Sequence, residues 1–298
     1  MNGFGISEFN FDKGETKSNR NSALNLLNNK SLNEPEINHY QVKTNINESY
    51  SNIKDLILEI EVENSNSKDV IKITSAGLPN SKRTKKDEND NYVYFGQKSQ
   101  NEEENSKIDY FLLGEVEKTT EISDKKSENE ESKKNLFFRI YYNFDMGLYY
   151  IKDMGGGYGT FYKIEEEIII KEKSLVNIGE TYLLFSFNKG NKFKDLNDDD
   201  LIIKVYSNKI EEQIVVKNTT KEYLFGRAEK CDFVIEDKML SRIHCIIYYL
   251  ENNWYIKDGN TTGQESTNGT WIFLQEDMEI KEGMKFKSNN CTFNCKFD

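Results

Sequence analysis

The sequence predicts an all-β protein in which two tandem β-sandwiches follow a disordered N-terminal tail. Three observations carry this prediction. Short segments alternate apolar and polar residues at a period of two, as residues 58–62 (LEIEV) do, which is the pattern of a half-buried strand. Aromatic residues are abundant, with 17 Tyr and 18 Phe, and they favour strands over helices. The chain also repeats its own motifs in the same order, which indicates two related units.

Residues 1–47 are predicted to be a disordered tail. They are rich in Asn, Ser, Lys and Glu and show no hydrophobic periodicity, so they cannot bury enough apolar surface to fold. One apolar cluster, residues 23–27, could form one or two helical turns against a partner. The start of the chain has no apolar run of the kind found in a signal sequence. No stretch approaches the ~18 apolar residues that span a membrane, so we expect no membrane contact.

From residue 55 onward, short strand patterns follow one another to the end of the chain, separated by polar turns. This succession is typical of a sandwich or barrel. The predicted strands cover residues 58–62, 70–74, 92–95, 136–142, 149–151, 167–170, 182–187, 201–206, 214–216, 233–235, 245–250, 254–256, 271–274, 284–286 and 292–297. Three charged, apolar-poor stretches, 80–91, 98–107 and 115–134, lie between strands, and we expect mobile loop insertions there.

The internal repeat divides the chain into domains. Five motifs of the first unit match five of the second: 55–60 with 200–205, 94–97 with 224–227, 132–135 with 241–244, 149–153 with 253–258, and 157–161 with 267–271. We therefore place one domain at 48–192 and a second at 193–298. The first is longer because it carries the charged insertions.

Composition excludes several classes of function. The net charge of −11 argues against a general nucleic-acid or anionic-membrane binder, which needs a basic face. The chain has two histidines, His39 in the tail and His244, and this inventory allows no credible Ser/His/Asp or Cys/His arrangement. We therefore expect no catalytic residues, no enzyme activity and no cofactor.

The four cysteines indicate a reducing location rather than a metal site. Cys231, Cys245, Cys291 and Cys295 lack the tight spacing of zinc ligands, so we expect them to be small core residues. Free thiols fit an intracellular protein, either cytoplasmic or nuclear.

Three separated segments of the second unit carry the functional signal: Gly226-Arg227, then Ser241-Arg242-Ile243-His244, then Ser266-Thr267-Asn268-Gly269-Thr270. Each segment alone has an ordinary interpretation as a turn with an exposed polar residue. Their joint occurrence, in this order and with strands between them, resembles the forkhead-associated (FHA) domain family over about 100 residues. That resemblance implies a β-sandwich whose loops bind phosphothreonine peptides.

The residue types suit this ligand. A phosphothreonine carries roughly −1.5 to −2 charges and three acceptor oxygens. Arg227 offers a permanently charged planar fork, and Ser241 and Thr267 offer hydroxyl donors. Arg242 supplies a second cation or a backbone N–H. Charge-assisted bonds of this kind contribute ~1.5–3 kcal/mol each.

The resemblance implies other tasks for the remaining residues. Asn268 presents both a donor and an acceptor, which suits bonding to the peptide backbone beside the phosphothreonine. Gly226 and Gly269 allow the turns that aim the binding residues. His244 is expected to be an internal support that holds the serine segment. Residues 259–265 are the loop expected to select the neighbouring peptide residue.

The first unit departs from the pattern. Gln97 stands at the arginine position and Tyr158 at the asparagine position; by sequence alone, Ser132 matches the serine and Asn135 the histidine. Lys98, Lys133 and Lys134 could replace part of the lost charge. We expect that phosphate recognition is lost in this unit and that its role is structural.

Two functional hypotheses follow. The first is an adaptor or scaffold that binds threonine-phosphorylated proteins through the second domain. The alternative is a constitutive component of a large assembly, ciliary or cytoskeletal, whose binding does not depend on phosphate. Binding that survives phosphatase treatment would favour the alternative.

Overall fold

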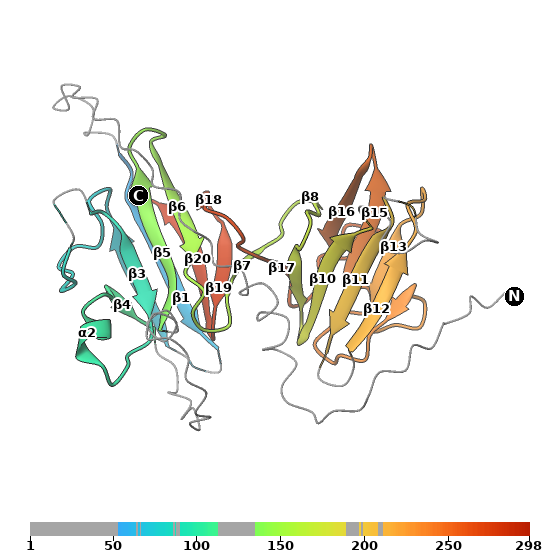
Figure 1. Ribbon diagram of the computed structural model, residues 1–298, viewed down its shortest axis with the longest axis horizontal. Coiled ribbons are helices and arrows are strands. Elements are labelled where there is room, and N and C mark those ends of the chain that lie inside the picture. Colours follow the sequence, from blue (N-terminus) through green and yellow to red (C-terminus); the bar gives the residue numbers. More distant parts are fainter. Residues whose placement is uncertain are drawn as a thin grey trace, which may run out of the picture.

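The computed structural model describes residues 53–63, 65, 67–85, 87, 90–112, 135–188, 197, 199–207 and 211–298. The predicted tail, 1–47, and the insertion 115–134 lie outside the described residues. The regular secondary structure of the described part is β-strand apart from one short helix, which confirms the predicted fold class (Figure 1). No helix among these residues is long and apolar enough to cross a membrane.

Among the described residues, each repeat contributes ten strands. The strands of the first repeat are β1 Leu56–Val62, β2 Lys68–Ile73, β3 Val93–Gly96, β4 Tyr110–Phe111, β5 Leu136–Asn143, β6 Leu148–Asp153, β7 Thr160–Lys163, β8 Ile168–Ile169, β9 Leu175–Ile178 and β10 Thr181–Phe187. Those of the second are β11 Leu201–Tyr206, β12 Glu211–Val216, β13 Tyr223–Gly226, β14 Phe233–Val234, β15 Cys245–Leu250, β16 Asn253–Asp258, β17 Thr270–Phe273, β18 Met278–Glu279, β19 Lys285–Ser288 and β20 Cys291–Phe297.

The strands that sequence patterns missed are short. β4, β7, β9, β13 and β18 have two to four residues each, which is too short for a period-two pattern to stand out. One helical turn, α2 Glu102–Asn105, forms within the predicted loop 98–107. It begins after Asn101, whose side chain accepts the Glu103 N–H at 3.0 Å as an N-cap.

The strand pairing does not follow the repeat boundaries. One sheet has the order β12-β11-β10-β9-β17-β7-β19-β20-β1-β2, and two five-stranded sheets have the orders β14-β13-β15-β16-β8 and β18-β6-β5-β3-β4. Thus β1 pairs with β20 of the other repeat along its full length, and β10 pairs with β11. One sandwich consists of β1–β7 with β18–β20, and the other of β11–β17 with β8–β10. The two repeats have exchanged their last three strands.

The exchange is centred on one strand pair, β7 with β17. β7 and β17 lie antiparallel to each other and join the two halves of the long sheet (Figure 1). Just beyond them, the Ile164 N–H donates to the Thr270 carbonyl at 2.9 Å and the Leu274 N–H donates to the Thr160 carbonyl at 2.9 Å. The paired contacts show that the arrangement is pseudo-symmetric. Connections 164–167 and 274–277 then carry each chain segment into the opposite sandwich.

The predicted boundary at 192/193 separates the two sequence repeats. As a boundary between domains it stays a prediction. The strand pairing places residues 168–187 in the sandwich of the second repeat and residues 278–297 in that of the first. Cutting the chain at 192 therefore separates each sandwich from three of its strands.

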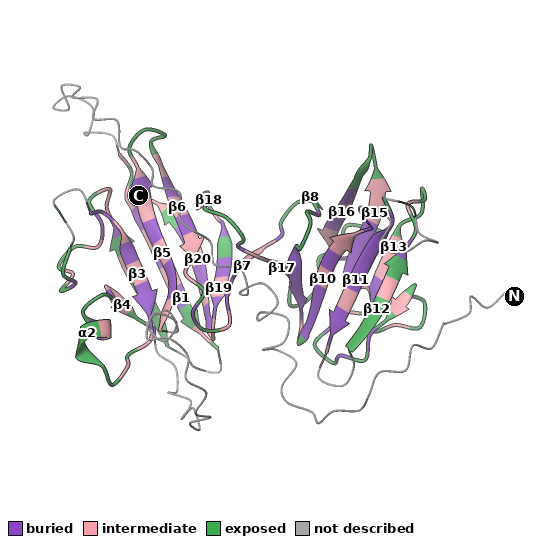
Figure 2. Cartoon of the chain, in the orientation of Figure 1, coloured by how far each residue is buried: buried purple, intermediate pink, exposed green. Residues whose placement is uncertain are grey.

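The cores show the same exchange (Figure 2). In the first sandwich, Phe138 of β5 packs edge-on against Phe286 of β19 and Phe293 of β20, with ring centroids 5.2 Å apart in both pairs. In the second, Phe185 of β10 belongs to the same buried cluster as Phe225 and Trp254. All four cysteines are buried, as the sequence predicted, and so are both tryptophans. No cluster of three or more metal-ligating side chains occurs among the described residues.

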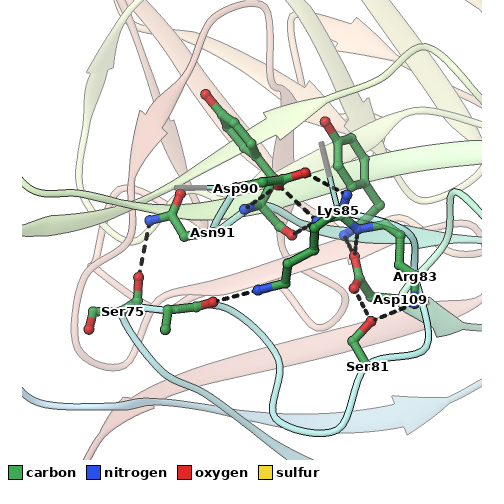
Figure 3. A network of polar contacts seen from close by, with 10 residues as sticks. Ser75, Ser81, Arg83, Lys85, Asp90, Asn91 and Asp109 are labelled. Atoms are coloured by element: carbon green, nitrogen blue, oxygen red, sulfur yellow. Dashed lines mark hydrogen bonds and ion pairs between the residues drawn. The ribbon is translucent and has the colours of Figure 1, made fainter. Parts of the chain in front are cut away.

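Loop 74–92 of the first repeat, predicted to be mobile over 80–91, is held by a buried ionic network (Figure 3). Arg83 donates to both carboxylate oxygens of Asp90 at 2.8 and 2.9 Å and to Asp109 at 2.7 Å. Its Nη2 also donates to the Tyr92 carbonyl at 2.7 Å. The described part of this loop is therefore held against the residues that lead into β3 and β4.

Candidate functional site

Two of the three predicted segments meet where β13 ends. The Arg227 N–H donates to the Ser241 carbonyl at 3.2 Å, and the Ala228 N–H donates to the Arg242 carbonyl at 3.1 Å. A Cβ at Gly226 would lie 2.5 Å from the Arg242 carbonyl oxygen. Because no side chain fits in that space, glycine at 226 lets the two loops approach each other.

The third segment joins them through hydroxyl groups. Ser241 Oγ accepts the Thr267 N–H at 2.9 Å and donates to Thr267 Oγ1 at 3.3 Å. Thr267 is exposed and Ser241 half-buried. The structure thus brings the arginine, serine and threonine segments to one end of the sandwich, with their hydroxyl groups close together.

His244 joins these loops through hydrogen bonds made in the interior of the sandwich. It is fully buried; its Nδ1 accepts the Ser241 N–H at 3.1 Å, and its Nε2 lies 3.0 Å from the Gly269 carbonyl. A carbonyl oxygen only accepts, so the ring is the Nε2–H tautomer. Burial lowers the pKa of His244 below its ordinary value, which agrees with a neutral ring. The side chain links the Ser241 loop to the 266–269 turn.

Asp258 is a support residue that motif reasoning missed. Its Oδ1 accepts hydrogen bonds from the Ser266 and Thr270 hydroxyls, each at 2.6 Å, and its Oδ2 accepts the Ser266 N–H at 2.8 Å. Ser266 Oγ in turn accepts the Gly269 N–H at 2.9 Å. This chain of bonds shapes the turn that presents Thr267 and Asn268. The recurrence of Ile-Lys-Asp at 151–153 and 256–258 was the available signal.

Asn268 lies at the edge of this group. Its Nδ2 donates to the Met239 carbonyl at 2.7 Å, while the residue itself is exposed. Gly269 follows with φ +74°, a left-handed conformation that favours glycine. The turn therefore directs Asn268 toward the loop that carries Met239, just before Ser241.

The cations of the site are available for a ligand. Arg227 and Arg242 are exposed, and within the described part of the chain neither guanidinium makes a hydrogen bond or an ion pair. Two such fork-shaped donors beside two hydroxyls can neutralise and bond a dianionic phosphate. The network below them fixes the loops before any ligand arrives.

The corresponding end of the first repeat differs more than the sequence comparison predicted. Strand pairing sets Phe95 opposite Phe138, as it sets Phe225 opposite Cys245. Counting back from that pair, the residue at the His244 position is Phe137, not Asn135, and a register shift at this point sets Gly96 opposite Leu136. Phe137 is buried and cannot bond the loops together. Ser132, Lys133 and Lys134 lie outside the described residues.

The family model of the FHA domain matches residues 223–287. The serine/threonine-protein kinase RAD53 of Saccharomyces cerevisiae is 29% identical, over 24% of this chain and 11% of the kinase. This chain thus aligns with about a tenth of that relative. The family-model match runs from the start of β13 into β19 and includes all the predicted site residues.

Among solved structures, the Slr1951 protein of Synechocystis sp. is 22% identical, covering 33% of this chain and 96% of that chain, with a TM-score of 0.23. The FHA-1 domain of Rv1747 from Mycobacterium tuberculosis is 16% identical, covering 28% and 88%, with a TM-score of 0.18. TM-scores of this size carry no argument beyond the family match.

Proposed function

We propose, from the premise that residues 223–287 form an FHA domain, that this protein is an adaptor or scaffold that binds threonine-phosphorylated proteins. FHA domains are interaction modules that take part in phosphothreonine-dependent binding and are not catalysts. In this chain, Arg227, Ser241, Arg242 and Thr267 bind the phosphate, and Asn268 bonds the peptide backbone beside it.

One observation carries the proposal. Ser241 joins all three predicted segments, through its carbonyl to the Arg227 N–H at 3.2 Å and through its hydroxyl to Thr267 at 2.9 and 3.3 Å. The backbones of Arg227 and Arg242 therefore lie next to the two hydroxyls, and these four residues together supply the charge and the donors that a phosphate needs.

Titration of the full chain tests this. Three peptides of one sequence, carrying phosphothreonine, phosphoserine or threonine, are compared by fluorescence anisotropy. We expect tight binding of the first alone, and a loss of about tenfold or more with Arg227→Ala, because a charge-assisted bond contributes ~1.5–3 kcal/mol. Lys281→Ala removes an exposed cation on the β18–β19 connection, outside the site, and serves as the matched control.

Two results would count against the proposal. Equal affinity for the phosphorylated and unphosphorylated peptides would exclude it. Co-purification with a large assembly after phosphatase treatment would favour the constitutive alternative. We also propose an intracellular location, supported by four cysteines that are buried and unpaired.

A further inference from the structure

A cavity of about 600 Å³ opens beside Asn268, and residues of both repeats line it. The second repeat supplies Asn268, Met239 and Trp271, and the first repeat supplies Tyr158, Asn177 and Tyr182. The cavity lies where β7, β9, β17 and β19 adjoin one another in the long sheet. It exists because the repeats exchange strands, since β9 reaches β17 only through that exchange.

The floor of the cavity is aromatic and carries one cation. Trp271 and Tyr182 are buried. Lys287 donates to Asn177 Oδ1 at 2.6 Å and lies over the Trp271 ring, 4.7 Å from its centroid. The ammonium group is thus already held by an amide oxygen and an aromatic face.

The exposed residues of the cavity include two acids, Glu63 and Glu180. With Lys287 as the one cation among the lining residues, two negative charges and one positive charge leave a net charge of −1. A long basic side chain suits such a lining, because its aliphatic stem can lie on the aromatic rings while its charged head reaches the carboxylates.

The first-repeat wall is tied to the loop that contacts Asn268. Asp237 Oδ2 accepts the Glu180 N–H at 2.8 Å and the Thr181 hydroxyl at 3.0 Å. Its Oδ1 accepts the Met239 N–H at 2.8 Å, and the Met239 carbonyl accepts from Asn268 at 2.7 Å. The β9–β10 turn of the first repeat therefore helps to position Asn268.

We propose that this cavity binds a basic side chain, arginine or lysine, near the phosphothreonine of the same peptide, so that the first repeat supplies part of the second repeat's specificity. The inference rests on the proposed function. Continuity supports it: Asn268 belongs both to the phosphopeptide site and to the cavity lining, so a peptide bonded to Asn268 runs along the opening. Tyr158, at the position of that asparagine in the first repeat, forms a wall of the cavity instead.

The test uses the full chain and phosphothreonine peptides in which arginine, glutamate or alanine occupies each of the three positions on either side. We expect one position where arginine is preferred over glutamate by about tenfold. Glu180→Lys should reverse that preference. Tyr158→Ala should weaken binding of the arginine peptide about tenfold and change binding of the alanine peptide less than twofold.

Matched controls are available on the first repeat. Glu165→Lys introduces the same charge change at an exposed residue that does not line the cavity, and Tyr150→Ala removes a tyrosine from β6. Equal affinities for the arginine and glutamate peptides, or a preference that Glu180→Lys leaves unchanged, would overturn the inference. If Arg227→Ala weakens binding about tenfold or more while either of these results is found, the proposed function stands and only the inference fails. Unchanged binding in Arg227→Ala would remove both.

Discussion

Phe286→Ala tests whether the two repeats exchange strands in solution. Phe286 belongs to the second repeat, yet its side chain is fully buried in the core of the first sandwich. Its ring stacks on Phe293 with centroids 4.5 Å apart and meets Phe138 of the first repeat edge-on at 5.2 Å. Removing the ring should therefore destabilise strands that belong to the other repeat.

The expected loss of stability is large because the Phe286 side chain is fully buried. Truncating a buried phenylalanine to alanine costs about 3–5 kcal/mol, through lost burial and the cavity that remains. At about 1.4 kcal/mol per factor of ten, amide exchange that requires opening of the first sandwich should accelerate roughly a hundredfold or more.

Hydrogen exchange read by mass spectrometry locates the effect. We expect faster exchange in β5 of the first repeat and little change in β15 of the second. Phe185→Ala is the reciprocal variant, because Phe185 belongs to the first repeat and lies in the second sandwich; it should accelerate β15 and spare β5. If Phe286→Ala accelerates β15 instead, each repeat folds on itself and the exchanged arrangement is refuted.

Three further outcomes are expected. Arg83→Ala should lower the free energy of unfolding by about 3–5 kcal/mol, because it leaves the buried carboxylates of Asp90 and Asp109 without their cation; chemical denaturation measures this, and a loss below about 1 kcal/mol would contradict it. Burial raises the pKa of Asp153 from 3.8 to about 7, so the wild type should lose stability as pH rises from about 4 to 7, by at most ~4 kcal/mol. Asp153→Asn should remove that slope in thermal melts taken across the same window, and a slope that persists would assign it to other groups. His244→Ala should weaken phosphopeptide binding about tenfold while the chain stays folded, because the Ser241 N–H and the Gly269 carbonyl lose their shared partner; unchanged affinity would show that the loops hold their shape without it.

The local features of the second repeat could be predicted because each depends on neighbours in sequence. Period-two segments such as residues 201–206 become strands wherever one face is buried, and β11 forms over those residues. Gly226, His244 and Asn268 were identified through the family resemblance that three separated motifs carry. The structure adds Asp258. Its role depends on the following turn, which folds back so that Ser266 and Thr270 donate to its carboxylate.

The register of the first repeat could not be predicted in the same way. Matching Asn135 to His244 relied on a short polar motif next to an insertion. The pairing of Phe95 with Phe138 moves the match to Phe137. A register is set by which side chains reach the core, and a shift of two residues preserves the alternation of faces, so the pattern alone does not distinguish the two.

By itself, the sequence determined that this protein is built from strands, that it contains the same unit twice, and which loops of the second unit form the candidate site. Tertiary structure alone decided which strands complete which sandwich. The last strand of each repeat pairs with the first strand of the other, β20 with β1 and β10 with β11, and the residue pattern of a strand does not encode which of the two it meets. Connections 164–167 and 274–277 leave the β7–β17 pair for the opposite sandwiches, and this arrangement brings Tyr158 and Glu180 of the first repeat to the edge of the Asn268 site.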